Sequence, residues 1–199
     1  MEKYKSMILE EHEWDNIFIQ NTQDTKTKRV LYIGDSISLG TRIQLKPLCN
    51  GKLVIDGIAT SKALDHPDYI PMLQAVSAQE PRRDVVLFNN GLHGYHLDED
   101  TYEAQYSVFV DKLLTLYPEA KLYLLLSTYT IDPEMHNDRI VERNCRITKI
   151  AEKKGLEIID QYSVSLENAS LLSSDDVHFT TEGYNVLAQS ILNFLKDRM

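Results

Sequence analysis

Cysteine and long hydrophobic segments are scarce in this sequence, and each shortage excludes a class of protein. The two cysteines, Cys49 and Cys145, do not form a Cys-x-x-Cys pair, so neither a zinc site nor a disulfide framework is indicated. We expect both as reduced thiols in the core. No apolar run approaches the length of a transmembrane helix, and the residues after Met1 are too polar for a secretory signal. These absences predict no membrane insertion and a cytoplasmic protein, or a secreted or periplasmic one if a signal has been removed.

Basic residues are also in the minority. The chain has 21 Lys and Arg against 30 Asp and Glu, a net charge of −9, and no basic stripe. Binding to nucleic acid or to an anionic membrane depends on such a basic surface, so we expect no nucleic-acid partner. The 199 residues, 43% of them hydrophobic, can bury the core of one domain without disulfides.

Short apolar segments alternate with helical patterns from residue 29 onward. The apolar segments have the length of buried strands, and the patterns between them repeat apolar residues at helical spacing. The expected strands are Val30–Ile33, Lys52–Asp56, Asp84–Phe88, Lys121–Ser127 and Leu156–Ile159, and the expected helices cover 39–48, 67–76, 100–117, 138–154 and a last segment from about 180. This alternation predicts an α/β fold, a three-layer α/β/α sandwich on a parallel five-stranded sheet.

The first 28 residues differ in character from the rest. They are polar and mixed apart from one apolar cluster, Trp14 and 17–19, and a polar run from Asn21 to Lys28 reads as a loop. We therefore expect an N-terminal extension, 1–28, that packs its tryptophan on a main domain, 29–199.

A serine follows the first expected strand without a linker. Val30–Ile33 runs directly into Gly34, Asp35 and Ser36. In open α/β sheets the carboxyl ends of the strands face the ligand crevice, so a serine there is placed for chemistry. The turns at Gly57, at 89–93 and after Ser127 should meet it at the same edge. The simpler alternative is a turn residue or a helix cap.

A nucleophilic serine needs a base, and the base needs an orienting group. The loop before the last expected helix contains Asp175, Asp176 and His178. Three residues of separation can place Asp175 beside Nδ1 of His178 and leave Nε2 for Ser36. Asp176 is the alternative partner, although its spacing favours pointing away. The loop also fits a second alternative, in which acidic residues cap the following helix.

These segments together resemble the SGNH, or GDSL, hydrolases. The resemblance rests on Gly34-Asp35-Ser36-Ile37, a glycine after the second strand, a glycine-containing turn after the third and Asp-x-x-His near the C-terminus. It implies a flavodoxin-like sheet and a catalytic domain over 29–199. It further implies Ser36 as nucleophile, His178 as base, Asp175 as orienting acid, and the N–H groups of Ser36 and Gly57 as oxyanion-hole donors. Family members hydrolyse esters and thioesters without metal or cofactor, removing acetyl groups from carbohydrates or acyl chains from lipids.

The third turn departs from the family pattern. Where the family has Gly-x-Asn-Asp, this chain reads Asn89-Asn90-Gly91-Leu92-His93-Gly94. Aligning the glycines puts His93 in the place of the asparagine that donates to the oxyanion, and Asn90 is the alternative donor. Losing one such donor typically costs about 10²–10³ in turnover.

The expected function is a serine esterase that removes a short acyl group, with acetyl as the favoured group, from a carbohydrate or another small ester. A lysophospholipase or thioesterase, or a degenerate module that only binds carbohydrate, are the alternatives. A nucleotide-binding protein is disfavoured because the first turn has neither a P-loop lysine nor GxGxxG spacing. The residues after the fourth strand could line the substrate groove or form a solvated rim: Tyr129, Asp132, His136, Arg139 and Arg143.

Overall fold

A computed structural model describes residue 9, residues 12–79 and residues 82–198. Within these residues a central sheet has the strand order β1-β3-β2-β4-β5-β6. Its strands are β1 (Asp15–Phe18), β2 (Lys28–Gly34), β3 (Leu53–Thr60), β4 (Val85–Phe88), β5 (Lys121–Leu125) and β6 (Glu157–Ile159). The helices are α1 (Ser36–Leu48), α2 (Tyr69–Gln79), α3 (Glu99–Leu116), α4 (Asn137–Lys154), α5 (Gln161–Glu167) and α6 (Thr181–Lys196).

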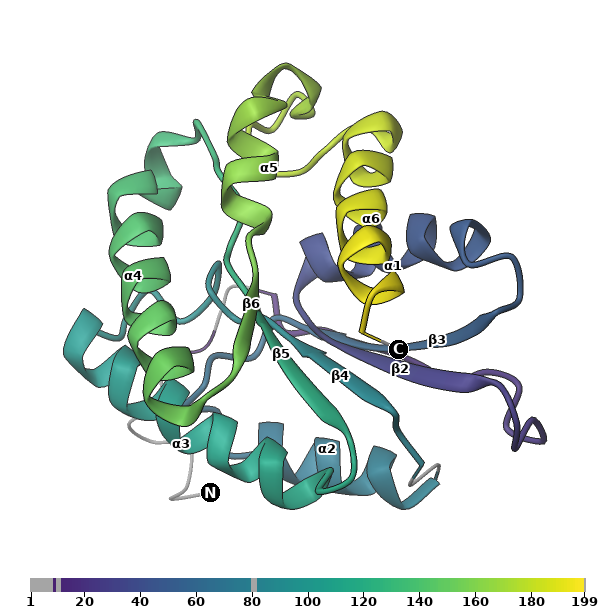
Figure 1. The fold of residues 1–199 in the computed structure, drawn as a ribbon. Coiled ribbons are helices and arrows are strands. Elements are labelled where there is room, and N and C mark those ends of the chain that lie inside the picture. The colour runs from purple at the N-terminus through teal and green to yellow at the C-terminus, as the bar shows by residue number, and fades with distance from the viewer. Residues whose placement is uncertain (1–8, 10–11, 80–81, 199) are drawn as a thin grey trace.

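Helices cover both faces of the sheet, as Figure 1 shows, so the expected three-layer α/β/α sandwich is confirmed. On one face, α2, α3 and α4 bury an aromatic-rich core that includes Tyr69, Tyr102 and Phe109. On the other face, α1 and α6 pack Leu45 and Ile191 against the sheet. The strands that carry these contacts are apolar on both sides, as strands between two helical layers must be.

The sheet has one strand more than expected. β1 comes from the segment expected as an extension and pairs antiparallel with β3, Asp15 opposite Thr60 and Phe18 opposite Gly57. The other neighbouring strands pair in parallel. A four-residue strand in a polar segment gives little sequence signal, because it is stabilised by pairing with β3 and by other contacts with distant segments. The division into an extension, 1–28, and a domain, 29–199, stays a prediction.

The second expected strand is longer than its sequence indicated. β3 continues to Thr60, and Gly57 lies inside it, opposite Tyr32 of β2 and Phe18 of β1. The expectation of a turn at Gly57 is therefore wrong. A Cβ at this position would lie 2.3 Å from Cδ of Arg42, so the glycine lets α1 approach the strand closely.

The two cysteines have different surroundings. Cys49 is buried, and burial raises the pKa of its thiol to about 11. Cys145 is exposed on α4, so the expectation of two core thiols is wrong for this residue. None of the helices in the described residues is long and apolar enough to span a membrane.

Candidate active site

Ser36 is the first residue of α1, and each residue of its motif has a local structural role. Asp35 caps the helix, since its buried carboxylate accepts from the N–H groups of Ile37 (3.0 Å) and Ser38 (3.3 Å). A Cβ on Gly34 would lie 1.9 Å from Oγ of Ser38, so only glycine allows this tight passage from β2 into α1. The result is a partly exposed serine at the positive end of a helix dipole.

A chain of hydrogen bonds joins Ser36 to the loop before α6. Oγ of Ser36 lies 2.8 Å from Nε2 of His178, and Nδ1 of His178 lies 2.7 Å from Oδ2 of Asp175. The three residues are far apart in sequence except for the Asp175–His178 pair, and the structure brings all of them together. With Nδ1 protonated and donating to the carboxylate, Nε2 is left to accept from the serine hydroxyl.

The Asp175 carboxylate is held by more than the imidazole. Oδ1 accepts from the backbone N–H of His178 (2.9 Å) and of Val177 (3.1 Å) and from the hydroxyl of Ser173 (2.7 Å). Desolvation raises the pKa of this carboxyl, but the hydrogen bonds from His178, Ser173 and Val177 outweigh it and hold the pKa well below its usual range. The group therefore stays ionised opposite His178. The contact between Ser173 and Asp175 was not predicted from the sequence, where the only indication was the position of Ser173 two residues before Asp175.

Asp176 has a different role from Asp175. Its backbone is left-handed, with φ of 61°, and its carbonyl accepts from the hydroxyl of Thr130 (2.6 Å) and the N–H of Ile131 (3.2 Å). Aspartate tolerates this conformation better than most residues. Asp176 thus ties the His178 loop to the segment after β5, while Asp175 contacts the imidazole.

The turn after β4 is held by its own asparagines. Asn89 donates through Nδ2 to the carbonyl of Leu125 (2.8 Å) and to Oγ of Ser127 (3.1 Å). Asn90 is fully buried and donates through Nδ2 to the carbonyl of Lys62 (2.9 Å), while its own carbonyl accepts from the hydroxyl of Tyr102. Both side chains therefore fasten the turn to neighbouring segments.

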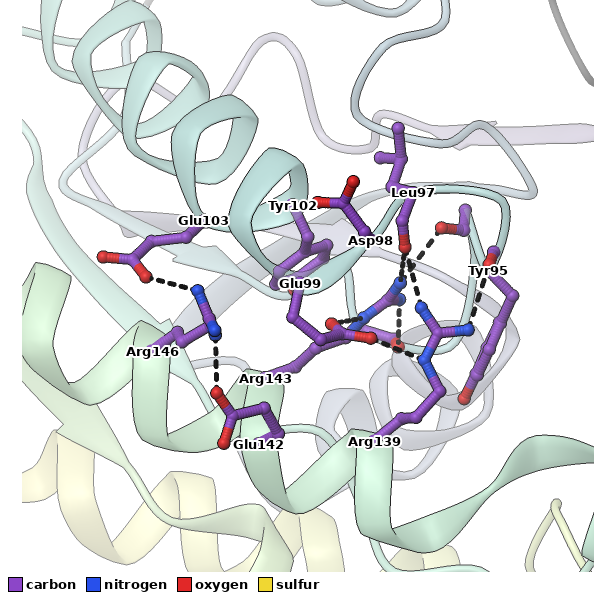
Figure 2. A network of polar contacts seen from close by, with 12 residues as sticks. Tyr95, Leu97, Asp98, Glu99, Tyr102, Glu103, Arg139, Glu142, Arg143 and Arg146 are labelled. Carbon is purple, nitrogen blue, oxygen red and sulfur yellow. Dashed lines mark hydrogen bonds and ion pairs between the residues drawn. The ribbon is translucent and has the colours of Figure 1, made fainter.

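Two arginines of α4, Arg139 and Arg143, donate hydrogen bonds to the turn after β4 (Figure 2). The guanidinium of Arg143 is fully buried and donates to four carbonyls, those of Gly91 (3.2 Å), His93 (3.0 Å), Gly94 (3.0 Å) and Leu97 (3.4 Å). Its fifth N–H donates to Glu99, 2.9 Å away.

Arg139 binds Glu99 as well, and donates to the carbonyls of Tyr95 (3.0 Å) and Leu97 (2.7 Å). Arg143 was expected to line the substrate groove or to lie on a solvated rim, and both alternatives are wrong because it is buried. The guanidinium of Arg139 is hydrogen-bonded to the same turn. Figure 2 shows both side chains pointing at the turn from α4.

The oxyanion-hole candidates are not all placed alike. Gly57 lies three residues before the end of β3 and pairs inside the sheet, so it is not at the edge where Ser36 lies. His93 lies in the turn that Arg143 clamps, at the carboxyl end of β4. Nε2 of His96 lies 3.0 Å from Oδ2 of Asp65.

The described residues contain no group of three or more His, Cys, Asp or Glu side chains arranged to hold a metal ion. What the site does contain is a serine, an imidazole and a carboxylate in series at a helix N-terminus. This arrangement can activate a hydroxyl for nucleophilic attack.

The fold is similar to that of solved SGNH, or GDSL, hydrolases. A lipase/acylhydrolase from Enterococcus faecalis superposes with a TM-score of 0.68 at 18% identity, over 86% of this chain and 97% of that one. A G-D-S-L family lipolytic protein from Veillonella parvula gives 0.69 at 18% identity, over 87% and 100%. The acetyl xylan esterase AlAXEase gives 0.62 at 20% identity, over 84% and 99%. No protein-family model matches the sequence, and no curated protein matches it significantly.

Proposed function

We propose that this chain is a serine esterase that removes a short acyl group, acetyl above all, from a carbohydrate or another small ester. The observation that supports it is the hydrogen-bonded series from Asp175 through His178 to Ser36, with contacts of 2.7 and 2.8 Å. These are the distances that a general base needs to its nucleophile and to its orienting acid.

In the proposed reaction, Oγ of Ser36 attacks the ester carbonyl carbon while Nε2 of His178 takes the hydroxyl proton. The tetrahedral intermediate collapses when the C–O bond to the alcohol breaks and His178 returns the proton to the leaving oxygen. Water, deprotonated by His178, then attacks the acyl carbon. The bond to Oγ of Ser36 breaks, His178 returns the proton to that oxygen, and the acid is released. Asp175 stabilises the imidazolium that forms in each half of the reaction.

Two donors are proposed for the negative oxygen of the intermediate. The backbone N–H of Ser36 is the first of α1, has no intrahelical acceptor, and is not one of the two that Asp35 caps. His93 is the proposed second donor, in preference to Asn90, because Asn90 is fully buried and its amide is held on the carbonyl of Lys62. Donors aimed at developing charge are usually the largest single contribution to such catalysis.

A short acyl group is favoured by the surroundings and by one of the similar structures, which is an acetyl xylan esterase. A cavity of about 510 Å³ with Leu48, Leu192 and Leu195 in its wall lies between the C-terminal halves of α1 and α6. The first residue of β3, Leu53, also lines it, so this cavity lies at the opposite end of the sheet from Ser36. An acyl chain attached to the serine does not reach it, which disfavours a long-chain lipid substrate.

The test is labelling with a fluorophosphonate probe combined with hydrolysis of p-nitrophenyl esters of increasing chain length. We expect the probe to label Ser36 and the acetate to be the best substrate. Ser36→Ala should abolish both signals without changing the circular dichroism spectrum. If the wild-type chain is neither labelled nor active, the nucleophile assignment is wrong and a binding role replaces it.

A further inference from the structure

A second hollow lies beside the catalytic series, between the segment after β5 and the start of α4. It measures about 450 Å³, and its lining includes Tyr129, Ile131, Asp132, His136, Asn137 and Asp138. Figure 1 shows the connection from β5 to α4 at the same end of the sheet as the loop that leads into α6. This volume is in the range of small-molecule sites.

The hollow and the His178 loop share a wall. The carbonyl of Asp176 accepts from the hydroxyl of Thr130 (2.6 Å) and the N–H of Ile131 (3.2 Å), and both Thr130 and Ile131 line the hollow. Asp176 directly follows Asp175, whose carboxylate holds His178 at 2.7 Å. A ligand in the hollow therefore lies against the loop that carries the base.

One wall of the hollow is rigid and aromatic. The ring of Tyr129 stands edge-on to Tyr162, at 6.2 Å and 80°. Asn137 donates through Nδ2 to the hydroxyl of Tyr162 (3.0 Å), and the N–H of Tyr129 donates to Oγ of Ser165 (2.8 Å). A ring fixed in this way offers a flat apolar surface at little entropic cost.

Other residues of the lining present polar groups that the protein itself does not use. Within the described residues, the His136 imidazole and the Asp138 carboxylate make no hydrogen bond, and both residues are exposed. His136 is left-handed, with φ of 45°, a conformation that costs free energy for a non-glycine residue. A lining that combines an aromatic ring with an imidazole and a carboxylate fits a pyranose ring, which has C–H faces and a hydroxyl rim.

The negative charge of the residues that line the hollow further restricts the class of ligand that it can bind. Asp132 and Asp138 line it and the Asp175 carboxylate lies on the adjoining loop, whereas no Lys or Arg is in the lining. The nearest guanidinium along the chain, that of Arg139, is bound to Glu99 and to the turn after β4. Phosphate-bearing leaving groups, such as the thiol coenzyme A or a lysophospholipid headgroup, would be repelled here.

We propose that this hollow binds the alcohol part of the ester as an uncharged, hydroxyl-rich sugar ring, an inference that rests on the esterase function proposed above. Tyr129 stacks on the ring, and His136 and Asp138 bind its hydroxyls. The acyl carbonyl then lies toward Ser36.

The test compares kcat/KM on an acetylated xylo-oligosaccharide with kcat/KM on p-nitrophenyl acetate. In Tyr129→Ala the ratio of sugar ester to small ester should fall about tenfold, the effect of losing one stacking partner. His136→Gly should lower the ratio while easing the left-handed backbone, so a fall cannot be ascribed to unfolding. Glu152→Gln, on an exposed site near the other end of α4, is the matched control and should leave the ratio unchanged.

A charge test separates the substrate classes. The wild-type chain should hydrolyse the acetylated sugar at least tenfold better than acetyl-coenzyme A. Asp138→Lys should narrow that gap by raising kcat/KM on acetyl-coenzyme A. A wild-type preference for acetyl-coenzyme A, or an unchanged ratio in both Tyr129→Ala and His136→Gly, overturns the sugar site while leaving the esterase assignment intact. Absence of hydrolysis and of Ser36 labelling overturns both.

Discussion

Replacement of Arg143 by lysine tests whether one buried guanidinium holds the turn after β4. Its five N–H donors meet five acceptors, the carbonyls of residues 91, 93, 94 and 97 and the Glu99 carboxylate. The plane also lies over the ring of Tyr102, 4.2 Å from its centroid. Lysine has three donors, so at least two of these acceptors lose a partner.

The expected cost follows from that deficit. A buried acceptor left without any donor costs about 1–3 kcal/mol of unfolding free energy. The carbonyl of Leu97 also accepts from Arg139 and that of Gly94 also accepts from the N–H of Leu97, so we expect a total cost of about 1–3 kcal/mol. Urea unfolding followed by circular dichroism measures the loss, with the m-value checked for two-state behaviour. Because the same guanidinium holds the carbonyl of His93 at 3.0 Å, we expect kcat for ester hydrolysis to fall as well.

The matched control is Arg146→Lys, one turn further along α4. Arg146 pairs with Asp100, Glu103 and Glu142 at the surface, where such pairs contribute about 0–1 kcal/mol. If Arg143→Lys is no less stable than Arg146→Lys, the turn is not held by its guanidinium and the reasoning fails.

Three further predictions concern the hydrogen-bonded series of Asp175, His178 and Ser36 and the nearby turn that contains His93. Asp175→Asn should slow ester hydrolysis by on the order of 10⁴-fold, as in a serine protease triad. Asp176→Asn should be close to wild type, because asparagine also tolerates the left-handed backbone. Equal effects of the two substitutions on steady-state kcat would contradict the assignment of Asp175. His93→Ala should lower kcat by about 10²–10³-fold with little change in KM, the pattern of a contact made in the transition state, whereas a silent His93→Ala with a crippled Asn90→Ala would move the donor to Asn90. The lowered pKa of the Asp175 carboxyl adds stability that is present above the unfolded-state pKa of about 3.9 and is lost as pH falls toward the folded-state pKa. A carbon-13 NMR titration should therefore find no Asp175 midpoint between about pH 3 and 5.

The sequence predicted the layered architecture because its signals are local. The apolar runs at 30–33 and 85–88 and the stripe of α3 from Tyr102 to Leu113 need no tertiary information, and all are buried as expected. The proximity of Ser36 to His178, 142 positions apart, was predicted from motif order and resemblance rather than from periodicity.

The sequence did not predict what depends on pairing between distant segments. Gly57 looked like a strand end because glycine usually ends strands, yet here it makes room for Arg42 inside β3. Arg143 was expected to line the substrate groove or a solvated rim, but it is buried. The sequence shows Arg143 within the helix, but its burial depends on five hydrogen-bond acceptors that come together only in the folded chain.

The antiparallel pairing of β1 determines the end of the sheet at which this strand begins. Because Asp15 lies opposite Thr60, the last residue of β3, β1 begins at the end where Ser36 and His178 lie. Asp15 also neutralises the ammonium of Lys62, at 2.7 and 2.8 Å, and the carbonyl of Lys62 receives Asn90. A chain that began at residue 29, and therefore lacked β1, would expose the backbone of β3 as a new sheet edge, prone to pairing with other copies. It would also leave a mostly buried lysine without its counter-ion, directly beside the turn that contains His93.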